Sequence, residues 1–266
     1  PGLDDKRLTS WNALMISALA EAGAVLERSD YLDAAAGAAE FVLGSLRDEQ
    51  GRLLRTWNDG RGRLNAYLED HAFLLEALLT LYESSFDPRW FAEARGLADT
   101  TIERFGDAEN GGFFETSSDH EQLLARRKDL EDHPIPSGNA SAAYGLLRLA
   151  ALTGEARYED WAVGVLRLLH VIATEHPHGF GHLLQALDFQ LAPVKEVALV
   201  GESHDLERVV RDSFRPHLVL AGGAPDGVPL LADRPPVDGK AAAYVCERFA
   251  CKAPVTTPEE LERLLA

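Results

Sequence analysis

The stretch YLEDHAFLLEALLTLYE, residues 67–83, contains the pattern from which most of the fold can be predicted. From Ala72 onward it has helical spacing and is apolar nearly all round, which is typical of a helix buried on both sides. Three ionisable residues, Glu69, Asp70 and His71, stand at its start. These residues either cap the helix or form part of a catalytic site, and the rest of the sequence helps to distinguish the two roles.

The same arrangement recurs along the chain. Apolar segments at 11–27, 71–84 and 139–152 are each followed by an amphipathic helix, and the loops GRLLRT and GGFFET occupy matching places. The repeating unit is a helical hairpin closed by a Gly-rich loop, repeated about three and a half times, the last half being 181–192. With the apolar helices inside and the amphipathic ones outside, the pattern predicts a mainly α fold, a partial α/α toroid.

The pattern changes after residue 192. Short apolar runs at 195–201, 217–223 and 241–249 predict strands, and the amphipathic segments 204–214 and 257–266 predict helices. We therefore expect two domains: the partial toroid at 1–192 and a small C-terminal α/β appendage, a β-α-β-β-α subdomain, at 193–266.

Composition narrows the possible partners. The chain has 266 residues and a formal net charge of −17, which argues against nucleic acid and acidic membrane surfaces. It has no apolar run of about 18 residues, so no membrane span is expected. No signal peptide is apparent, and we expect a cytoplasmic location. The first residue is not Met and the only methionine is Met15, so we expect either a processed product or, as the favoured interpretation, a piece of a longer protein.

Polar residues gather at three equivalent helix starts. These are Ser10-Trp11-Asn12, Glu69-Asp70-His71 and Ser137-Gly138-Asn139. A helix cap requires one such group, so these starts carry more than capping needs. If the array curves, they converge on one cavity, where carboxylates and imidazole could do general acid–base chemistry. A purely capping role for Asp70 and His71 remains about as well supported.

Two further segments contribute candidates. The loop RRKDLEDHPIPSGNAS, residues 126–141, places mixed charges on a stiff segment before a helix, which suits a polyhydroxylated ligand or a solvated surface loop. His182 starts the last inner helix, and the spacing of His176, His178 and His182 does not favour a metal site. We expect no metal and no cofactor. The candidate catalytic residues are Asp70, His71, Asp132 and His182; the candidate ligand-binding residues are Trp11, Asn12, Trp57, Tyr67, Glu69, Lys128, Asp129, Ser137 and Asn139.

The two cysteines, Cys246 and Cys251, are too few for a disulfide framework and lack the C-x-x-C spacing of redox motifs. Buried structural cysteines are the favoured interpretation. A pair exposed enough to exchange with a partner thiol is the alternative.

Several motifs together resemble a known family. They are DDKRLTSWNALMISALAEAG, YLEDHAFLLEALLTLYE, KDLEDHPIPSGNASAA, GHLLQALDF and AYVCERFACKAPVTTPEEL. They are similar to the C-terminal half of the thioredoxin-domain proteins related to spermatogenesis-associated protein 20 and bacterial YyaL. The resemblance implies a six-hairpin toroid like those of N-acylglucosamine 2-epimerases and cellobiose epimerases, preceded by a thioredoxin-like domain. It also implies that the N-terminal half of the same protein is a partner.

Two functions follow from this resemblance and from the site pattern. The first is a carbohydrate-binding or carbohydrate-processing domain, epimerase-, isomerase- or glycosidase-like, in which His71 and His182 are placed to move a proton at a sugar carbon. The second is a non-catalytic scaffold or redox-accessory module. In either case the first helix should show a bare apolar face, because its apolar residues do not fit on one stripe, and the chain alone should self-associate. These residues are Leu14, Ile16, Leu19, Ala20 and Val25.

Overall fold

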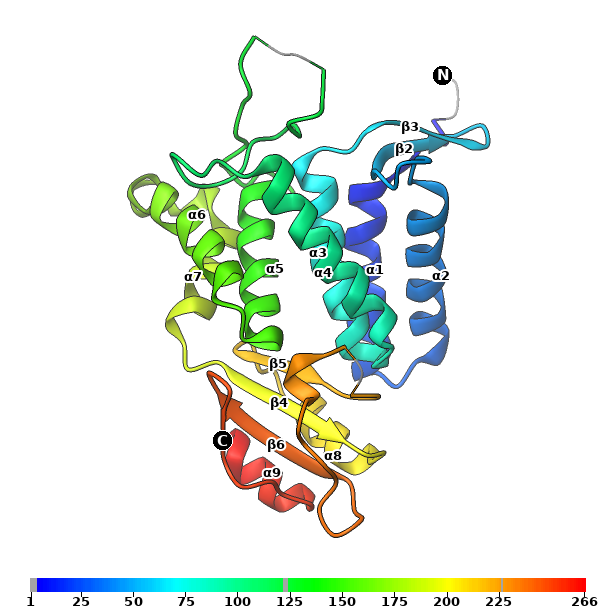
Figure 1. Ribbon diagram of the computed structural model, residues 1–266, viewed down its shortest axis with the longest axis vertical. Coiled ribbons are helices and arrows are strands. Elements are labelled where there is room, and N and C mark those ends of the chain that lie inside the picture. The colour runs from blue at the N-terminus through cyan, green and yellow to red at the C-terminus, as the bar shows by residue number, and fades with distance from the viewer. Residues whose placement is uncertain (1–3, 122–123, 226) are drawn as a thin grey trace.

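The computed structural model describes residues 4–121, 124–225 and 227–266 (Figure 1). Its first part consists of helical hairpins that pair α1 (Thr9–Val25) with α2 (Ser29–Ser45), α3 (Leu68–Ser85) with α4 (Pro88–Phe105), and α5 (Gly138–Thr153) with α6 (Ala156–Glu175). A short 3-10 turn, η1 (Pro177–Gly179), leads to α7 (Gly181–Leu191). α1 contacts α3, α3 contacts α5, and α5 contacts α7. The second helix of each hairpin, α2, α4 or α6, packs mainly on the first helix of the same hairpin. The predicted inner and outer layers are therefore present.

Local sequence signals explain where these helices begin and end. Asp87 caps α4 by accepting the Arg89 N–H at 3.0 Å, with Pro88 as the first helical residue. Ser137 caps α5 by accepting the Ala140 N–H at 3.1 Å, and Gly154 ends that helix with a φ of 73°. Because these signals are strong and local, the predicted bounds agree with the structure to within a few residues.

Burial differs between the inner helices. α3 and α5 are buried over most of their lengths, whereas α1 is buried on one side only. Ile16 and Ala20 are fully buried, so that part of the predicted bare face of α1 is wrong. The bare face is formed by Val25, which was predicted, together with Trp11 and Met15; Trp11, Met15 and Val25 are 64%, 57% and 54% exposed.

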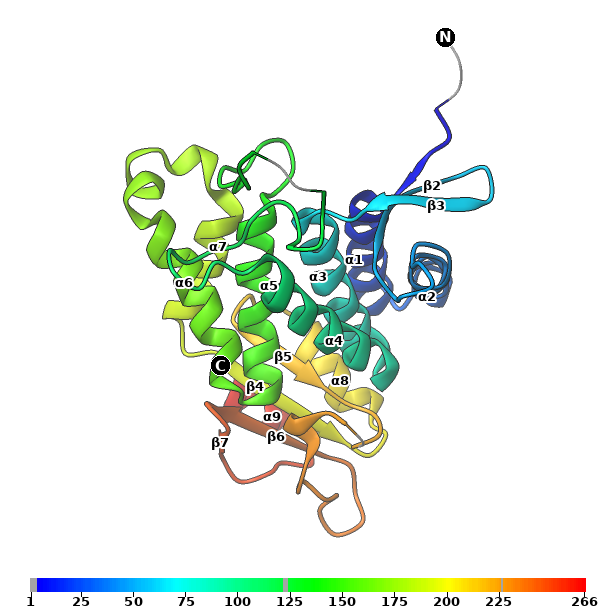
Figure 2. The same ribbon diagram turned by 45° about the horizontal axis from the view of Figure 1, so that its top comes forward.

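The first Gly-rich loop contains a small sheet that the sequence interpretation missed. β2 (Leu54–Asn58) and β3 (Arg61–Asn65) form an antiparallel hairpin, and β1 (Arg7–Leu8) pairs with β2. Asp59 and Gly60, both with positive φ, make the two-residue turn. Figure 2 shows the hairpin at the end of the array where α1 and α3 begin. It therefore frames the starts of the inner helices.

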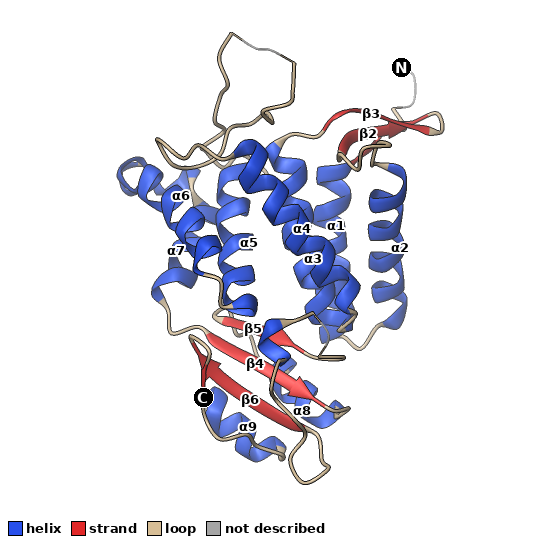
Figure 3. Cartoon of the chain, in the orientation of Figure 1, coloured by secondary structure: helices blue, strands red, loops and turns tan. Residues whose placement is uncertain are grey.

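A second sheet covers the opposite end of the array (Figure 3). It has the order β5-β4-β6-β7, with β4 (Lys195–Val200) parallel to β5 (Leu218–Ala221) and antiparallel to β6 (Ala242–Glu247), which pairs with β7 (Ala250–Cys251). α8 (His204–Arg211) connects β4 to β5; the 3-10 turn η2 (Pro229–Leu231) and the helix α9 (Pro258–Leu265) complete the appendage. The α/β appendage predicted after the helical array is present.

The sheet is buried on both faces. Residues on one face, such as Ala198 and Val219, join the core of the helical array, while alternate residues such as Val197 and Leu220 pack under α8 and α9. Because one core runs across residue 192, the division into domains 1–192 and 193–266 remains a proposal. Among the described residues, no helix has both the length and the hydropathy to cross a membrane.

Candidate functional site

Asp70 joins the starts of two inner helices. Its carboxylate accepts the N–H groups of Tyr67 at 2.9 Å and Ser10 at 3.0 Å, and it pairs with Arg55 at 3.0 Å. Burial raises the pKa of Asp70 to about 6, although the charge of Arg55 and the two backbone hydrogen bonds act to lower it. Asp70 is thus more than a cap of its own helix, since it also holds α1 and the β2–β3 hairpin in place. A ligand could therefore contact the Asp70 carboxylate only at positions that these three contacts leave free.

Asn139 and Asp132 tie loops to the other helix starts. The Asn139 side chain accepts the Phe113 N–H at 2.8 Å and donates to the carbonyls of Phe113 and Asp129 at 3.0 and 2.8 Å. Asp132 accepts the N–H groups of Ser137 at 2.8 Å and His182 at 2.7 Å. Asp132 therefore bridges the starts of α5 and α7 and fixes the position of His182.

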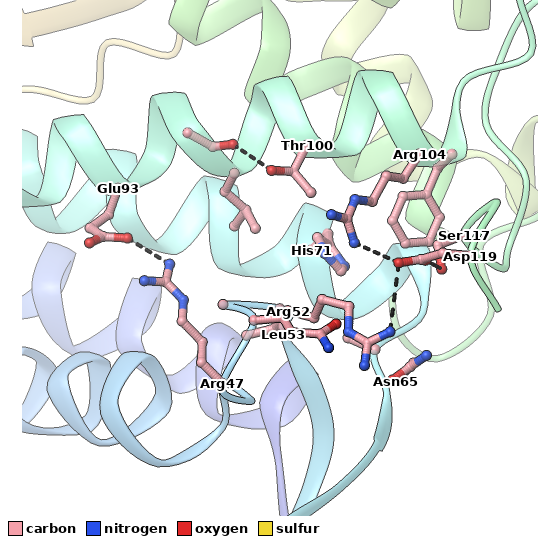
Figure 4. Close-up of a pocket in the computed structure, with 16 residues that line it drawn as sticks. Arg47, Arg52, Leu53, Asn65, His71, Glu93, Thr100, Arg104, Ser117 and Asp119 are labelled. Atoms are coloured by element: carbon pink, nitrogen blue, oxygen red, sulfur yellow. Dashed lines mark hydrogen bonds and ion pairs between the residues drawn. The ribbon is translucent and has the colours of Figure 1, made fainter.

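His71 faces a small cavity on the outer side of α3, which we call the outer pocket (Figure 4). The outer pocket measures about 230 Å³ and lies between the loop after α2, the start of α3 and α4. Its charged side chains are all paired: Arg47 with Glu93 at 2.6 Å, Arg104 with Asp119 at 2.7 Å, and Arg52 with Asp48 at 2.7 Å. A cavity whose charges are already matched has little left with which to hold a charged ligand.

The ionisation of His71 follows from its surroundings. Burial lowers its pKa to about 4, so the imidazole is neutral at pH 7. Nδ1 lies 3.1 Å from the Tyr67 carbonyl oxygen, which can only accept, so Nδ1 carries the proton. His71 is therefore a neutral, internally bonded histidine.

A different polar cluster occupies the inner side of the array. An inner cavity of about 570 Å³ is lined by α1, α3, α5, α7, α8, the segment 212–216, Leu218 and Leu220, with no contribution from the described residues of α2, α4 or α6. Polar side chains of α1, of α8 and of the segment 212–216 also line this cavity, but we define the inner cluster as seven polar side chains at and beside it: Glu76, Thr80, Glu83, Tyr144, Arg148, His182 and Gln185. All of them come from α3, α5 and α7.

The inner cluster has two hydrogen-bonded centres. His182 Nε2 lies 3.0 Å from Glu76 Oε1, and the Tyr144 ring meets the His182 ring edge-on at a centroid distance of 5.6 Å. Arg148 contacts Glu83 Oε1 at 3.2 Å and Thr80 Oγ1 at 3.1 Å, and its guanidinium lies 5.8 Å from the centroid of the Tyr144 ring. A mostly buried acid–imidazole pair thus stands beside a mostly buried carboxylate–guanidinium pair.

Burial and charge set the pKa values in the inner cluster. Burial lowers the pKa of His182, but the hydrogen bond and charge of Glu76 outweigh it and the net shift is upward. Burial raises the pKa of Glu83, which the Arg148 guanidinium only partly offsets. Burial also raises the pKa of Tyr144 and keeps its phenol protonated. Titratable groups with shifted pKa values in a cavity are typical of functional sites.

The prediction that all the candidates converge on one cavity is wrong. His71 lies at the outer pocket, whereas His182 meets the inner cavity through Glu76. The reason is that buried polar groups at helix starts must be hydrogen-bonded, and here the nearby loops provide the partners. Trp11 is exposed and Trp57 packs on Phe41 at the β2–β3 hairpin.

The remaining ligand-binding candidates are also engaged within the chain. Asn12 donates to the Leu8 carbonyl, Glu69 pairs with Arg55, Tyr67 stacks on His120, Lys128 pairs with Asp107, and Ser137 caps α5. Burial raises the pKa of Asp129, and the negative charge of Glu69 nearby raises it further. The two carboxylates therefore lie near one another at the helix starts. None of these residues lines the inner cavity or belongs to the inner cluster.

Sequence reasoning missed most of the inner cluster. Glu69, Glu76 and Glu83 recur every seven residues and so lie on one face of α3, a signal that was available. Arg148 interrupts the apolar pattern of α5 in the same way. Charged residues inside apolar helices could have been singled out as the likeliest lining of a buried polar site.

The cysteines also differ from the favoured interpretation. Cys246 is buried, but Cys251 is exposed, and the two form a disulfide between β6 and β7. Neighbouring antiparallel strands bring the two residues opposite each other, which the C-x4-C spacing alone did not indicate. Among the described residues, no group of three or more His, Cys, Asp or Glu is arranged to hold a metal ion.

Comparisons with known proteins place the chain among relatives. It is 33% identical to spermatogenesis-associated protein 20 of Homo sapiens and 33% identical to that of Rattus norvegicus, over essentially its whole length. This chain is a homologue of spermatogenesis-associated protein 20. It spans about a third of the length of these relatives, 36% in each case. A protein of Caenorhabditis elegans described as uncharacterized is 26% identical. No family model matches the chain.

Three solved structures with a similar fold are carbohydrate enzymes. Cellobiose 2-epimerase from Bacillus thermoamylovorans superposes with a TM-score of 0.53 at 15% identity, covering 62% of this chain and 45% of that enzyme. Cellobiose 2-epimerase from Spirochaeta thermophila gives 0.51 at 20% identity, over 62% and 43%. An α-mannanase of Bacteroides thetaiotaomicron gives 0.51 at 14% identity, over 64% and 44%. These likenesses confirm the fold class, a partial α/α toroid.

Proposed function

We propose that the inner cavity binds a carbohydrate-like ligand and that the Glu76–His182 pair transfers a proton on it. The observation that carries this proposal is the buried pair itself, 3.0 Å apart beside a 570 Å³ cavity. A cavity of that size is within the range of small-molecule sites. The fold shared with two cellobiose epimerases and an α-mannanase supports the ligand class.

The inner cluster offers the contacts that a sugar requires. The Arg148 guanidinium and the Gln185 amide can donate hydrogen bonds to hydroxyl groups, and the carboxylates of Glu76 and Glu83 can accept them. The face of Tyr144 adds an apolar surface against which a sugar ring can pack. These groups come from rigid helices, which holds them in fixed relative positions.

The bonding of His182 assigns its proton-transfer atom. The Glu76 carboxylate accepts, so Nε2 carries hydrogen and Nδ1 is the nitrogen that gains or loses a proton. In an epimerase-type reaction, Nδ1 would take the proton from the carbon beside an open-chain carbonyl, leaving an enediolate. The protonated Tyr144 phenol would return a proton to that carbon, and the imidazolium beside it would then give its proton to the phenolate, which restores both groups. General acid–base groups of this kind contribute about 10²- to 10⁴-fold in rate.

Hydrogen exchange at the sugar carbon tests this function directly. The chain is incubated in D₂O with cellobiose, glucose and mannose, and loss of the C2 proton signal is followed by NMR. We expect exchange that Glu76→Gln and His182→Asn lower by at least about a hundredfold. His217→Asn is the matched control, because His217 pairs with Asp188 at 2.6 Å outside the inner cavity. Equal exchange in His182→Asn and wild type would contradict the assignment.

We further propose that the bare face of α1 is covered by a helical segment of a longer form of the same protein. Two observations support this: Trp11, Met15 and Val25 are more than half exposed, and the human relative is far longer than this chain. The toroid neighbours likewise have more than half of their length outside the superposed region. A scaffold role for the chain would rest on this same face.

A further inference from the structure

The Cys246–Cys251 disulfide has one accessible sulfur and one protected one. Cys246 is 1% exposed on β6, between β4 and β7, whereas Cys251 is exposed on the short edge strand β7. A thiolate that approaches from solvent can therefore reach the Cys251 sulfur and not the Cys246 sulfur. Thiol–disulfide exchange depends on which sulfur can be attacked and on how well the other leaves.

A guanidinium group is placed at both sulfurs. Arg234 Nη2 lies 3.1 Å from Cys251 Sγ and 3.7 Å from Cys246 Sγ. Arg234 is held there by a hydrogen bond from Nη1 to the Ala232 carbonyl at 2.9 Å and by the nearby Phe249 ring, 5.9 Å from the guanidinium. A fixed positive charge beside a sulfur stabilises its thiolate, which makes the sulfur a better leaving group.

The hairpin that carries the disulfide has other ties to the fold. Glu196 on β4 accepts the Phe249 N–H at 2.7 Å, and the Lys252 N–H donates to the Val245 carbonyl at 3.0 Å. The Phe249 ring packs over Gly154 at the end of α5, where an added Cβ would lie 3.1 Å from it. Opening the disulfide therefore leaves the hairpin attached, so exchange can take place in the folded protein.

We propose that Cys246–Cys251 is a thiol–disulfide exchange site whose substrate is a dithiol reductant. One thiolate of the reductant attacks Cys251 Sγ, the Cys246–Cys251 bond breaks, and Cys246 leaves as a thiolate beside Arg234. The second thiol of the reductant then attacks the mixed disulfide and releases the Cys251 thiolate. Two electrons and two protons pass from the dithiol, which becomes a disulfide, to the cystine, which becomes two thiols. This site is separate from the inner cavity and does not depend on its proposed function.

Reduction of the folded chain by dithiothreitol tests the proposal. Thiols are alkylated and counted by mass at timed intervals, and circular dichroism monitors the fold. We expect two thiols to appear while the protein stays folded, and Arg234→Gln to slow their appearance about three- to tenfold. Arg248→Gln is the matched control, since Arg248 is an exposed arginine of the same hairpin, and it should leave the rate unchanged. A disulfide that opens only on unfolding, or equal rates in the two arginine variants, would overturn the proposal.

Single-cysteine variants identify the attacked sulfur independently of the Arg234 result. In Cys246→Ser, the thiol of Cys251 should react with 5,5′-dithiobis(2-nitrobenzoate) in the folded protein. In Cys251→Ser, the buried thiol of Cys246 should react at least about tenfold more slowly, because burial restricts access. Equal reactivity of the two thiols, or faster reaction at Cys246, would contradict the assigned direction of attack.

Discussion

Replacing Arg148 by Met removes the cation that neutralises Glu83 in the inner cluster. The Arg148 side chain is 9% exposed and the Glu83 side chain 17%, so the pair is largely desolvated. Breaking such a pair by removing one partner costs about 3–5 kcal/mol, because a buried charge is left uncompensated. Met keeps much of the apolar stem of Arg148, which limits the loss of packing. Because Arg211 also bears on Glu83 electrostatically, we expect a cost of about 3 kcal/mol at pH 7.

The pH dependence of this cost has a definite sign. Burial raises the pKa of Glu83 in the wild type, and loss of Arg148 must raise it further. A carboxyl group with a raised pKa in the folded state binds its proton more tightly there than in the unfolded state. The contribution of Glu83 to folding stability is therefore lost as the pH rises through its folded-state pKa. The cost of Arg148→Met should accordingly shrink as the pH falls toward the unfolded-state pKa of Glu83.

Urea denaturation of single and double variants measures both effects. Glu83→Gln in the Arg148→Met background removes the buried charge, and we expect it to recover at least half of the loss, about 1.5 kcal/mol. Arg89→Met is the matched control, because Arg89 pairs with Glu40 at side-chain exposures of 52% and 56%, where pairs contribute about 0–1 kcal/mol. The reasoning is refuted if Arg148→Met costs no more than Arg89→Met, or if the double variant recovers nothing.

Three further predictions test other parts of the structure. Glu76→Gln should lower the pKa of His182, measured by NMR titration, because Glu76 provides the hydrogen bond and charge that raise it; an unchanged pKa would contradict the pairing. Gly23→Ala should destabilise the chain by about 1–3 kcal/mol in thermal denaturation, since its Cβ would lie 3.0 Å from a backbone nitrogen of α2. Gly37→Ala, with open space around it on α2, should instead stabilise by about 0.5–1 kcal/mol, and the same sign for both would refute the packing argument. Asn139→Ala should cost about 3 kcal/mol, because three buried backbone groups lose their partner, and a cost near zero would show that the loops hold without it.

The helices could be predicted because their signals are local. Apolar periodicity marks the buried faces, and residues such as Asp87, Pro88 and Ser137 mark the starts within the sequence itself. The β2–β3 hairpin was missed although Asp59-Gly60 is a strong turn signal, because the surrounding glycines favoured a loop. Short strands of mixed polarity carry a weak periodic signal, and their pairing depends on tertiary contacts.

The site was harder to predict than the fold because partners decide the role of a polar residue. The sequence places Asp70 and Asn139 at helix starts, but only the structure gives the loops that occupy their hydrogen-bonding groups. His182 was singled out at the start of the last inner helix, but its partner Glu76 lies 106 residues away in sequence. Long-range pairing of this kind leaves no local pattern, so Glu76 and Arg148 could be suspected only as charges within apolar helices.

The bare face of α1 leads to a last prediction, whose size follows from its exposure. Trp11, Met15 and Val25 are 64%, 57% and 54% exposed, and full burial of such side chains contributes about 1.5–3 kcal/mol each, so covering the face contributes about 3–5 kcal/mol. When a separate copy of the chain covers the face, this gain must also offset an association cost of about 4–15 kcal/mol. A segment of the same polypeptide avoids most of that cost, because it is present at the face at about millimolar effective concentration. We therefore expect the chain alone to self-associate weakly, with sedimentation coefficients that rise with concentration, and Trp11→Glu with Met15→Lys to remove that rise. A longer form of the protein should show no such rise, and its Trp11 should become protected from quenching by acrylamide. A chain that stays monomeric at every concentration, with a longer form whose Trp11 is still quenched, would show that this face has no occupant.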